Sequence, residues 1–172
     1  RGIGKSFVAL DMMRAITTQK PFLGLPTLSR QSVLYVDGEM QLSEIRQRAI
    51  AMGIPRIGDR ANFISAEDFF EQFGRYVNLN GPEDQASLLK TLRNYAMKEN
   101  DPYLIIFDNI SSLCKGNLDS ATSTEEDYSF LEFLRKLRHF GYSALTVTHD
   151  GKDVLRGPRR TSKQEDFVDV SI

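Results

Sequence analysis

The first six residues of the chain could bind phosphate. They read Arg-Gly-Ile-Gly-Lys-Ser, and the last three complete a pattern of one glycine, four residues and then Gly-Lys-Ser or Gly-Lys-Thr. The first glycine of that pattern would precede Arg1. Glycines let successive backbone N–H groups turn toward an anion, and the following helix directs its positive end to the same place. The alternative is a glycine turn that merely caps a helix.

If the segment is a phosphate-binding loop, its residues have distinct roles. Lys5 would reach the β- and γ-phosphates of a nucleoside triphosphate, and the hydroxyl of Ser6 would ligate Mg²⁺. We therefore predict ATP with Mg²⁺ as the bound species. The predicted nucleotide-binding residues are Gly2, Ile3, Gly4, Lys5, Ser6 and Phe7.

An acid ends an apolar segment in the middle of the chain. Residues 104–107 are Leu-Ile-Ile-Phe, and Asp108 follows them. In open α/β sheets, ligands bind at the carboxyl ends of buried strands, so Asp108 would hold Mg²⁺ directly or through water. The alternative is an aspartate that caps the next turn.

A second apolar segment, residues 33–36, also ends in carboxylates. Asp37 and Glu39 are two residues apart and would share a face on extended backbone, with Gly38 allowing a sharp exit. We predict that Glu39 orients the attacking water, and that Asp37 supports the metal or anchors a neighbouring loop. Glu39 could instead be a first-turn acid of the next helix, where the helix dipole favours it.

Further candidates lie near the end of the sequence. His149 follows the apolar segment 144–147 and could sense the γ-phosphate, although a histidine there is often structural. Residues 150–165 are polar and basic. Such a loop could bind the phosphate backbone of a nucleic acid, or it could be an ordinary solvent-exposed loop. It has no aromatic residue for base stacking. The nucleic-acid candidates are Lys152, Arg156, Arg159, Arg160 and Lys163.

Apolar segments alternate with helical patterns along the chain, which predicts an α/β fold: a mostly parallel sheet with helices on both faces. Residues 66–82 are expected to be irregular, with one helical turn near 68–73, and residues 109–124 to form a loop. The predicted helices cover residues 5–19, 42–52, 83–98 and 124–140, and the predicted strands cover 32–37, 62–65, 103–108, 142–148 and 167–172.

Composition narrows the class of protein. The 172 residues are enough for one domain with a hydrophobic core. A net charge of −1 argues against nucleic-acid binding over the whole surface of the protein. One cysteine excludes an intrachain disulfide and fits a reducing compartment, so we expect a cytoplasmic protein without a zinc site. No apolar run approaches the roughly 20 residues that span a bilayer.

The ordered set of motifs resembles that of the RecA-like P-loop ATPases, and in particular the RepA-like group of plasmid and phage hexameric helicases with their AAA relatives. The motifs are Arg-Gly-Ile-Gly-Lys-Ser, Leu-Tyr-Val-Asp-Gly-Glu-Met, Leu-Ile-Ile-Phe-Asp-Asn and Thr-His-Asp-Gly-Lys. Lys-Pro-Phe-Leu-Gly at residues 20–24 is also similar to that group. The resemblance covers nearly the whole chain.

The resemblance implies one RecA-like ATPase domain over residues 1–172, cut inside the phosphate-binding loop and before the end of the core. It implies a homo-oligomer, such as a hexameric ring, with ATP between subunits. It gives Glu39 the role of the catalytic glutamate, Asp108 that of the Walker B aspartate and His149 that of the γ-phosphate sensor. It directs the loop after Asp150 toward single-stranded DNA, although an acid there departs from the family pattern. Arg156, Arg159, Arg160 or a residue beyond Ile172 would be the arginine supplied in trans.

Three functions compete at this point. The leading hypothesis is a nucleic-acid-dependent ATPase, either a replicative helicase or a recombination motor. The second is an ATP-binding oligomer that regulates or loads another protein, without DNA-stimulated turnover. The third is a small-molecule phosphotransferase, which the absence of an arginine-rich lid in the sequence disfavours.

Overall fold

A computed structural model of the chain describes residues 4–54, 59–96, 102–114 and 125–148. The four described strands are β1 (Ser32–Asp37), β2 (Ala61–Ser65), β3 (Pro102–Asp108) and β4 (Ser143–Val147). They form one sheet in the order β2-β1-β3-β4, and all three neighbouring pairs are parallel. The prediction of an α/β fold with a parallel sheet is confirmed.

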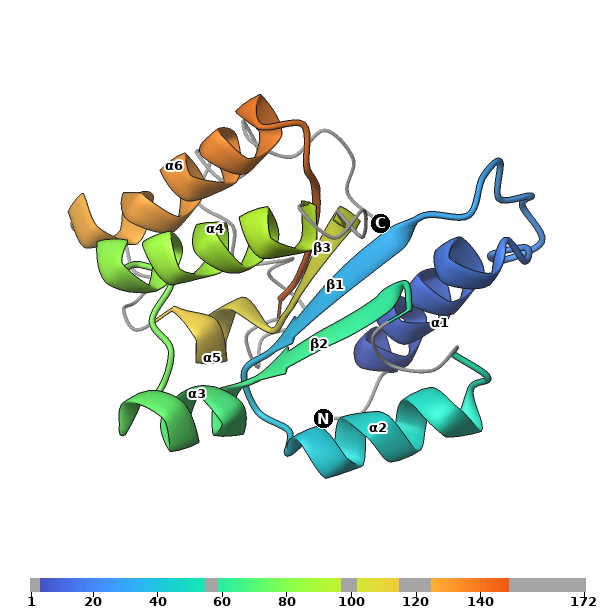
Figure 1. The fold of residues 1–172 in the computed structure, drawn as a ribbon, viewed down its shortest axis with the longest axis horizontal. Coiled ribbons are helices and arrows are strands. Elements are labelled where there is room, and N and C mark those ends of the chain that lie inside the picture. The colour runs from blue at the N-terminus through green and yellow to red at the C-terminus, as the bar shows by residue number, and fades with distance from the viewer. Residues whose placement is uncertain (1–3, 55–58, 97–101, 115–124, 149–172) are drawn as a thin grey trace, which may run out of the picture.

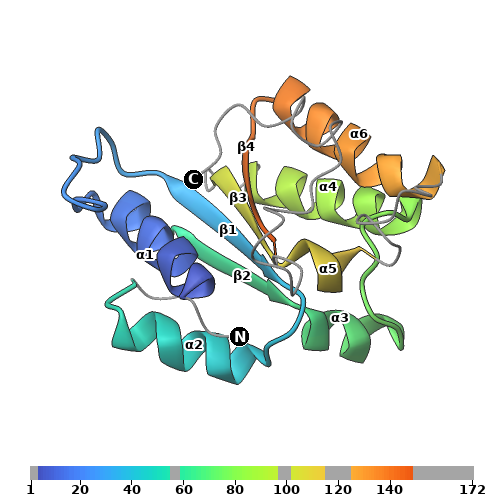
Figure 2. The ribbon, with the colours of Figure 1, turned by 180° about the vertical axis from the view of Figure 1, so that it is seen from behind.

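Helices cover both faces of this sheet (Figure 1). Helices α1 (Lys5–Thr18) and α2 (Leu42–Ala51) lie on one face. Helices α4 (Pro82–Ala96), α5 (Ile110–Leu113) and α6 (Glu125–His139) lie on the other. Figure 2 shows the same layers from behind, with α1 and α2 on the left of the strands and α4, α5 and α6 on the right.

Strand alternation divides the core into two clusters. Val33 and Tyr35 of β1 pack with Leu104 and Ile106 of β3 beneath α1, whereas the alternate side chains of the same strands face α4 and α6. Successive side chains of a strand point to opposite faces, so strands buried on both sides are apolar throughout. All six residues of β1 are buried, as the continuous apolar pattern of residues 33–36 predicts.

Two segments differ from the sequence prediction. Residues 66–82 were expected to be irregular with one helical turn near 68–73, but Ala66–Phe73 form the longer, two-turn helix α3. It begins with a capping box, in which the Ser65 hydroxyl accepts from the backbone N–H of Asp68 and the Asp68 carboxylate accepts from that of Ser65. The predicted loop 109–124 begins with the short helix α5, which Asn109 caps.

No helix among the described residues is both long and apolar enough to cross a bilayer. The predicted strand over 167–172 lies outside the described residues, so its place in the sheet stays a prediction.

Candidate functional site

The site begins where two central strands end. Asp37 is the last residue of β1, Asp108 is the last residue of β3, and the two are register partners in the parallel pair. Both residues occupy strand positions whose side chains point to the face of the sheet that α1 covers. They are 2 % and 5 % exposed. Each acid therefore ends its strand at the carboxyl edge of the sheet, as the sequence pattern predicts, and the structure places the two side by side.

The amino end of α1 reaches the same edge. Gly4 precedes the helix with a φ of 79°, a left-handed conformation that glycine adopts without strain. No side chain caps this helix, and its first turn contains no acid. The first N–H groups and the positive end of the helix dipole therefore have no anionic partner within the helix itself. Such a terminus is suited to a phosphate.

The chain turns sharply after Asp37 instead of continuing in extended form. Asp37 Oδ1 accepts hydrogen bonds from the backbone N–H groups of Glu39 at 2.7 Å and Met40 at 2.6 Å. We expected Asp37 and Glu39 to share one face of an extended strand. That expectation is wrong, because β1 ends at Asp37. The turn nevertheless brings Glu39 back beside the strand ends. Of the two roles left open for Asp37, the loop anchor is present in the structure.

Gly38 allows this turn to lie close to the end of β3. Its N–H donates to the carbonyl of Asp108 at 2.8 Å. A Cβ atom at Gly38 would lie 2.2 Å from the Oγ of Ser112 in α5, which is far inside contact distance. Only glycine fits here, and the turn after β1 is packed directly against the segment after β3.

Asn109 is a site residue that the sequence analysis did not single out. Its Nδ2 donates to Glu39 Oε1 at 2.7 Å, while its Oδ1 accepts from the backbone N–H of Ser112. Asn109 is 2 % exposed, so its amide is held firmly between the α5 cap and the Glu39 carboxylate. The sequence did contain one signal for Asn109, because it is a polar residue directly after an acid that ends a strand. Its partner lies 70 positions away, which no local pattern reveals.

The acids at the strand ends are surrounded by buried polar groups. Tyr35 donates its hydroxyl to Asp108 Oδ2, and burial together with the nearby Asp108 charge raises the pKa of this phenol. Burial raises the pKa of Asp37 to about 6, although the hydrogen bonds from the backbone of Met40 and Glu39 oppose that shift. Asp108 also raises it, because two carboxylates at adjacent strand ends repel each other.

One small cavity of about 160 Å³ lies beside Asp37 and Asp108 at these strand ends. It brings together four residues predicted from the sequence. It adds three that were not predicted: Asn109, Met40 and Arg48. The position of Arg48 in helix α2 does not by itself indicate that this residue lines the cavity. Its guanidinium lies 5.6 Å from the ring centre of Phe7. The four predicted residues in the cavity are Ser6, Asp37, Glu39 and Asp108.

The oxygen donors of this cavity suit Mg²⁺. A hydroxyl and carboxylates are the ligands that this ion takes, and it retains several waters rather than requiring a full protein cage. Within the described part of the chain, no three His, Cys, Asp or Glu side chains are grouped closely enough to hold a metal by themselves. A water-rich ion held by Ser6 and one or two aspartates is compatible with that arrangement.

Several predicted site residues lie outside the described residues. Among the nucleotide-binding candidates these are Gly2 and Ile3, and the sensor candidate His149 lies there as well. Phe7, by contrast, is described and is 52 % exposed beside the cavity. The nucleic-acid candidates that also lie outside the described residues are Lys152, Arg156, Arg159, Arg160 and Lys163.

A comparison with protein families agrees with this geometry. A family model described as an AAA domain matches residues 1–154, which is most of the chain. The chain belongs to the AAA domain family. A comparison with curated proteins finds no match. The AAA domain family is one of P-loop ATPases, so the match supports the ATPase class.

Proposed function

We propose that this AAA domain hydrolyses ATP at the cavity between the amino end of α1 and the carboxyl ends of β1 and β3. The observation that carries the proposal is that Ser6, Glu39 and Asp108, distant in sequence, line one cavity beside an uncapped helix terminus. An anion-binding terminus, a hydroxyl and separate carboxylates are the parts that phosphoryl transfer to water requires.

Each residue has a role in this proposal. Lys5 and the N–H groups of the first turn of α1 bind the β- and γ-phosphates. Ser6 and Asp108 would hold Mg²⁺, which would supply neutralisation of the developing negative charge. Tyr35 keeps the Asp108 carboxylate in place through its hydrogen bond. These groups fix the nucleotide in line with its attacking water.

Glu39 orients the attacking water and accepts its proton. A carboxylate can do this only if one oxygen faces the water in a defined direction. Asn109 Nδ2 donates to Glu39 Oε1 at 2.7 Å and so fixes the orientation of that carboxylate. Asn109 therefore acts as a positioning residue, since it touches Glu39 rather than the reacting atoms.

We further propose that turnover is coupled to nucleic acid in a homo-oligomer, as in a replicative helicase or recombination motor. The support is the resemblance to RepA-like helicases and the basic composition of residues 150–165. His149 would connect the γ-phosphate to that segment, and an arginine from a neighbouring subunit would complete the site.

The test of the coupling is ATP turnover by the full-length protein with and without single-stranded DNA. We expect stimulation by DNA that falls steeply between 50 and 200 mM salt, because phosphate contacts release counterions. Turnover indifferent to DNA would reject the motor and favour a regulator or loader. No turnover in either condition would reject the hydrolase itself.

A further inference from the structure

A buried tyrosine inside the sheet contacts one acid of the candidate site. Tyr35 of β1 is the register partner of Ile106 in β3, and Asp108 lies two residues further along the same strand. Residues two apart on a strand share a face, so Tyr35 and Asp108 are diagonal neighbours on the face that α1 covers. The Tyr35 hydroxyl donates a hydrogen bond to Asp108 Oδ2. The register of the two strands thus brings a phenol to this carboxylate.

The core holds Tyr35 in this position. Its side chain is fully buried and packs in the apolar cluster beneath α1. Its ring centre lies 5.9 Å from that of Phe63, its register partner on β2. A large ring in a close-packed interior has little room for another rotamer. The hydroxyl, and the Asp108 oxygen that it binds, therefore stay in one place.

The other acid at the strand ends is restrained in a similar way. Asp37 Oδ1 accepts hydrogen bonds from the backbone N–H groups of Glu39 at 2.7 Å and Met40 at 2.6 Å. One oxygen of each aspartate is therefore bound by a donor of the protein. A cation that binds a carboxylate in bidentate fashion uses both oxygens, so it would have to break these buried hydrogen bonds, which is costly. Each aspartate is suited to bind a cation through one oxygen.

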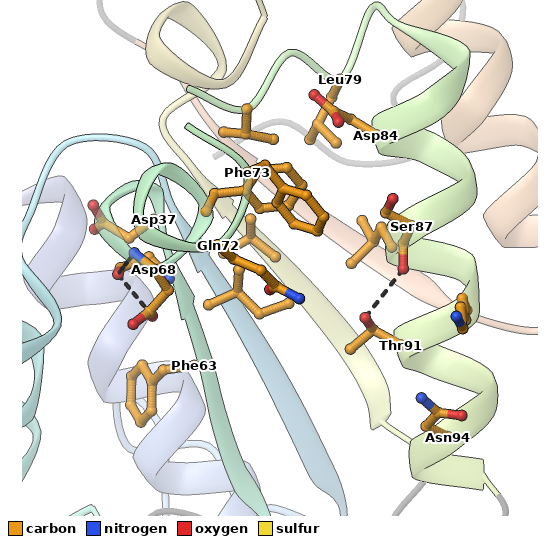
Figure 3. Close-up of a pocket in the computed structure, with 17 residues that line it drawn as sticks. Asp37, Phe63, Asp68, Gln72, Phe73, Leu79, Asp84, Ser87, Thr91 and Asn94 are labelled. Atoms are coloured by element: carbon orange, nitrogen blue, oxygen red, sulfur yellow. Dashed lines mark hydrogen bonds between the residues drawn. The ribbon is translucent and has the colours of Figure 1, made fainter. Parts of the chain in front are cut away.

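The acids of the larger cavity, of about 560 Å³ between α3 and α4, serve local structure instead. Figure 3 shows Asp68 of α3 and Asp84 of α4 on opposite sides of that cavity. Both oxygens of Asp84 accept from Arg75, at 2.7 and 2.6 Å. Asp68 Oδ2 accepts from the hydroxyl and the backbone N–H of Ser65. A cation that enters with a nucleotide is therefore expected in the smaller cavity, beside Asp37 and Asp108.

Magnesium and calcium ions differ in the carboxylates that they accept. Mg²⁺ requires a near-ideal octahedron, retains several waters and is held by one or two carboxylates. Ca²⁺ takes more oxygen ligands at longer distances, in a flexible geometry, and binds carboxylates through one oxygen or both. Ligand number and flexibility therefore decide which ion a site prefers. Rigid acids that each present one oxygen favour Mg²⁺.

We propose that Tyr35 is a positioning residue that makes the nucleotide site select Mg²⁺ over Ca²⁺. The inference rests on the proposed ATP site and adds the cation specificity of that site. Tyr35 acts through Asp108, because its hydroxyl binds the acid rather than the ion. Without this hydroxyl, Asp108 would be able to rotate and to offer both oxygens, which suits the larger ion.

The variant Tyr35→Phe tests this role in the full-length protein, because it removes the hydroxyl and retains the buried ring. The probe is a non-hydrolysable ATP analogue, titrated by calorimetry in saturating Mg²⁺ or saturating Ca²⁺. We expect the parent protein to bind the Mg²⁺ form at least about tenfold more tightly, and Tyr35→Phe to lower that preference about tenfold, since it removes a partner of a metal ligand. Circular dichroism checks that the variant is folded.

Tyr95→Phe is the matched control. It removes another phenol hydroxyl, from a half-buried tyrosine on α4 that does not line the site cavity. We expect it to retain the Mg²⁺ preference of the parent protein.

The ratio of the two affinities separates this role from a structural one. A structural loss in Tyr35→Phe would weaken both forms equally, and a ratio at the parent value would overturn the proposal. A parent protein that binds both forms equally well would overturn it without any variant, while the ATP site itself would stand. A parent protein that binds neither form would reject the ATP site, and the proposal with it.

Discussion

At the scale of single residues, the candidate site depends on a few side chains with separable roles. In the proposed function, Ser6 and Asp108 hold the metal ion and Glu39 is the base, to which Asn109 donates a hydrogen bond. Each can be changed without removing a large apolar side chain from the core. Binding and turnover can therefore be measured separately in variants that still fold.

Lys5 is expected to matter for binding. Replacing it with alanine removes the positive charge at the amino end of α1, where the β- and γ-phosphates are proposed to lie. We expect Lys5→Ala to weaken ATP binding at least about tenfold, as measured by titration calorimetry, because charge-assisted contacts to phosphate are strong. Lys136→Ala, on the exposed side of α6, is the matched control. Parent-like affinity in Lys5→Ala would remove the lysine from the site.

Asn109 is expected to matter for turnover rather than for affinity. Asn109→Asp retains the oxygen that caps α5 but replaces the donor to Glu39 with a like charge. We expect kcat to fall about tenfold or more while KM for ATP stays near the parent value. Asn109→Ser, which also keeps an α5 cap, should lose turnover less severely because it brings no charge. Equal loss of kcat and ATP affinity would indicate a structural role instead.

At the scale of elements, the site exists because two segments after parallel strands pack against each other. Gly38 follows β1, and Ser112 lies in α5 after β3. We expect Gly38→Ala to cost about 1–3 kcal/mol of unfolding free energy, because its new methyl group overlaps Ser112. Urea denaturation measures that cost.

A double-mutant cycle checks the cause of that loss. Ser112→Gly removes the overlapping atoms, so Gly38→Ala should cost less in that background than in the parent, although glycine lowers the baseline stability of α5. If the stability losses of Gly38→Ala and Ser112→Gly are additive in the double variant, the close contact between the two segments is not the reason that position 38 requires glycine.

Sequence patterns predicted the elements that are long and strongly apolar. Residues 32–37 and 103–108 were correctly predicted as buried strands because burial on both faces demands continuous apolar runs. Helix α3 was missed because it has only eight residues and its Ser65–Asp68 capping box was not recognised. The Glu39–Asn109 contact was beyond prediction, since sheet order alone brings the two segments together.

At the scale of the whole molecule, the parallel sheet formed by the four described strands separates two apolar clusters, and the candidate site lies at its carboxyl edge. Ligands of open α/β sheets bind at this edge because helix amino termini and strand ends converge there. The fold therefore supports an ATPase site without specifying what the energy of hydrolysis drives.

Cys114 provides a probe of the integrity of the fold. It is 2 % exposed at the end of α5, and burial raises the pKa of its thiol to about 12. Alkylation requires the thiolate, so at pH 8 we expect iodoacetamide to label native Cys114 about a thousandfold more slowly than the unfolded chain. Mass spectrometry of the peptide that contains Cys114 measures both rates. Rapid labelling of the native protein would show that the cluster beneath α4 and α6 opens readily.

The most direct test of the proposed hydrolysis compares Glu39→Gln with Glu44→Gln in the full-length protein. Glu44 is an exposed acid in the first turn of α2 and does not line the cavity, so it controls for loss of charge nearby. We measure steady-state ATP turnover and, separately, ATP affinity. The account predicts that Glu39→Gln lowers kcat by about a hundredfold or more with affinity retained, because it removes a general base, and that Glu44→Gln matches the parent. Native turnover in Glu39→Gln would contradict the central claim.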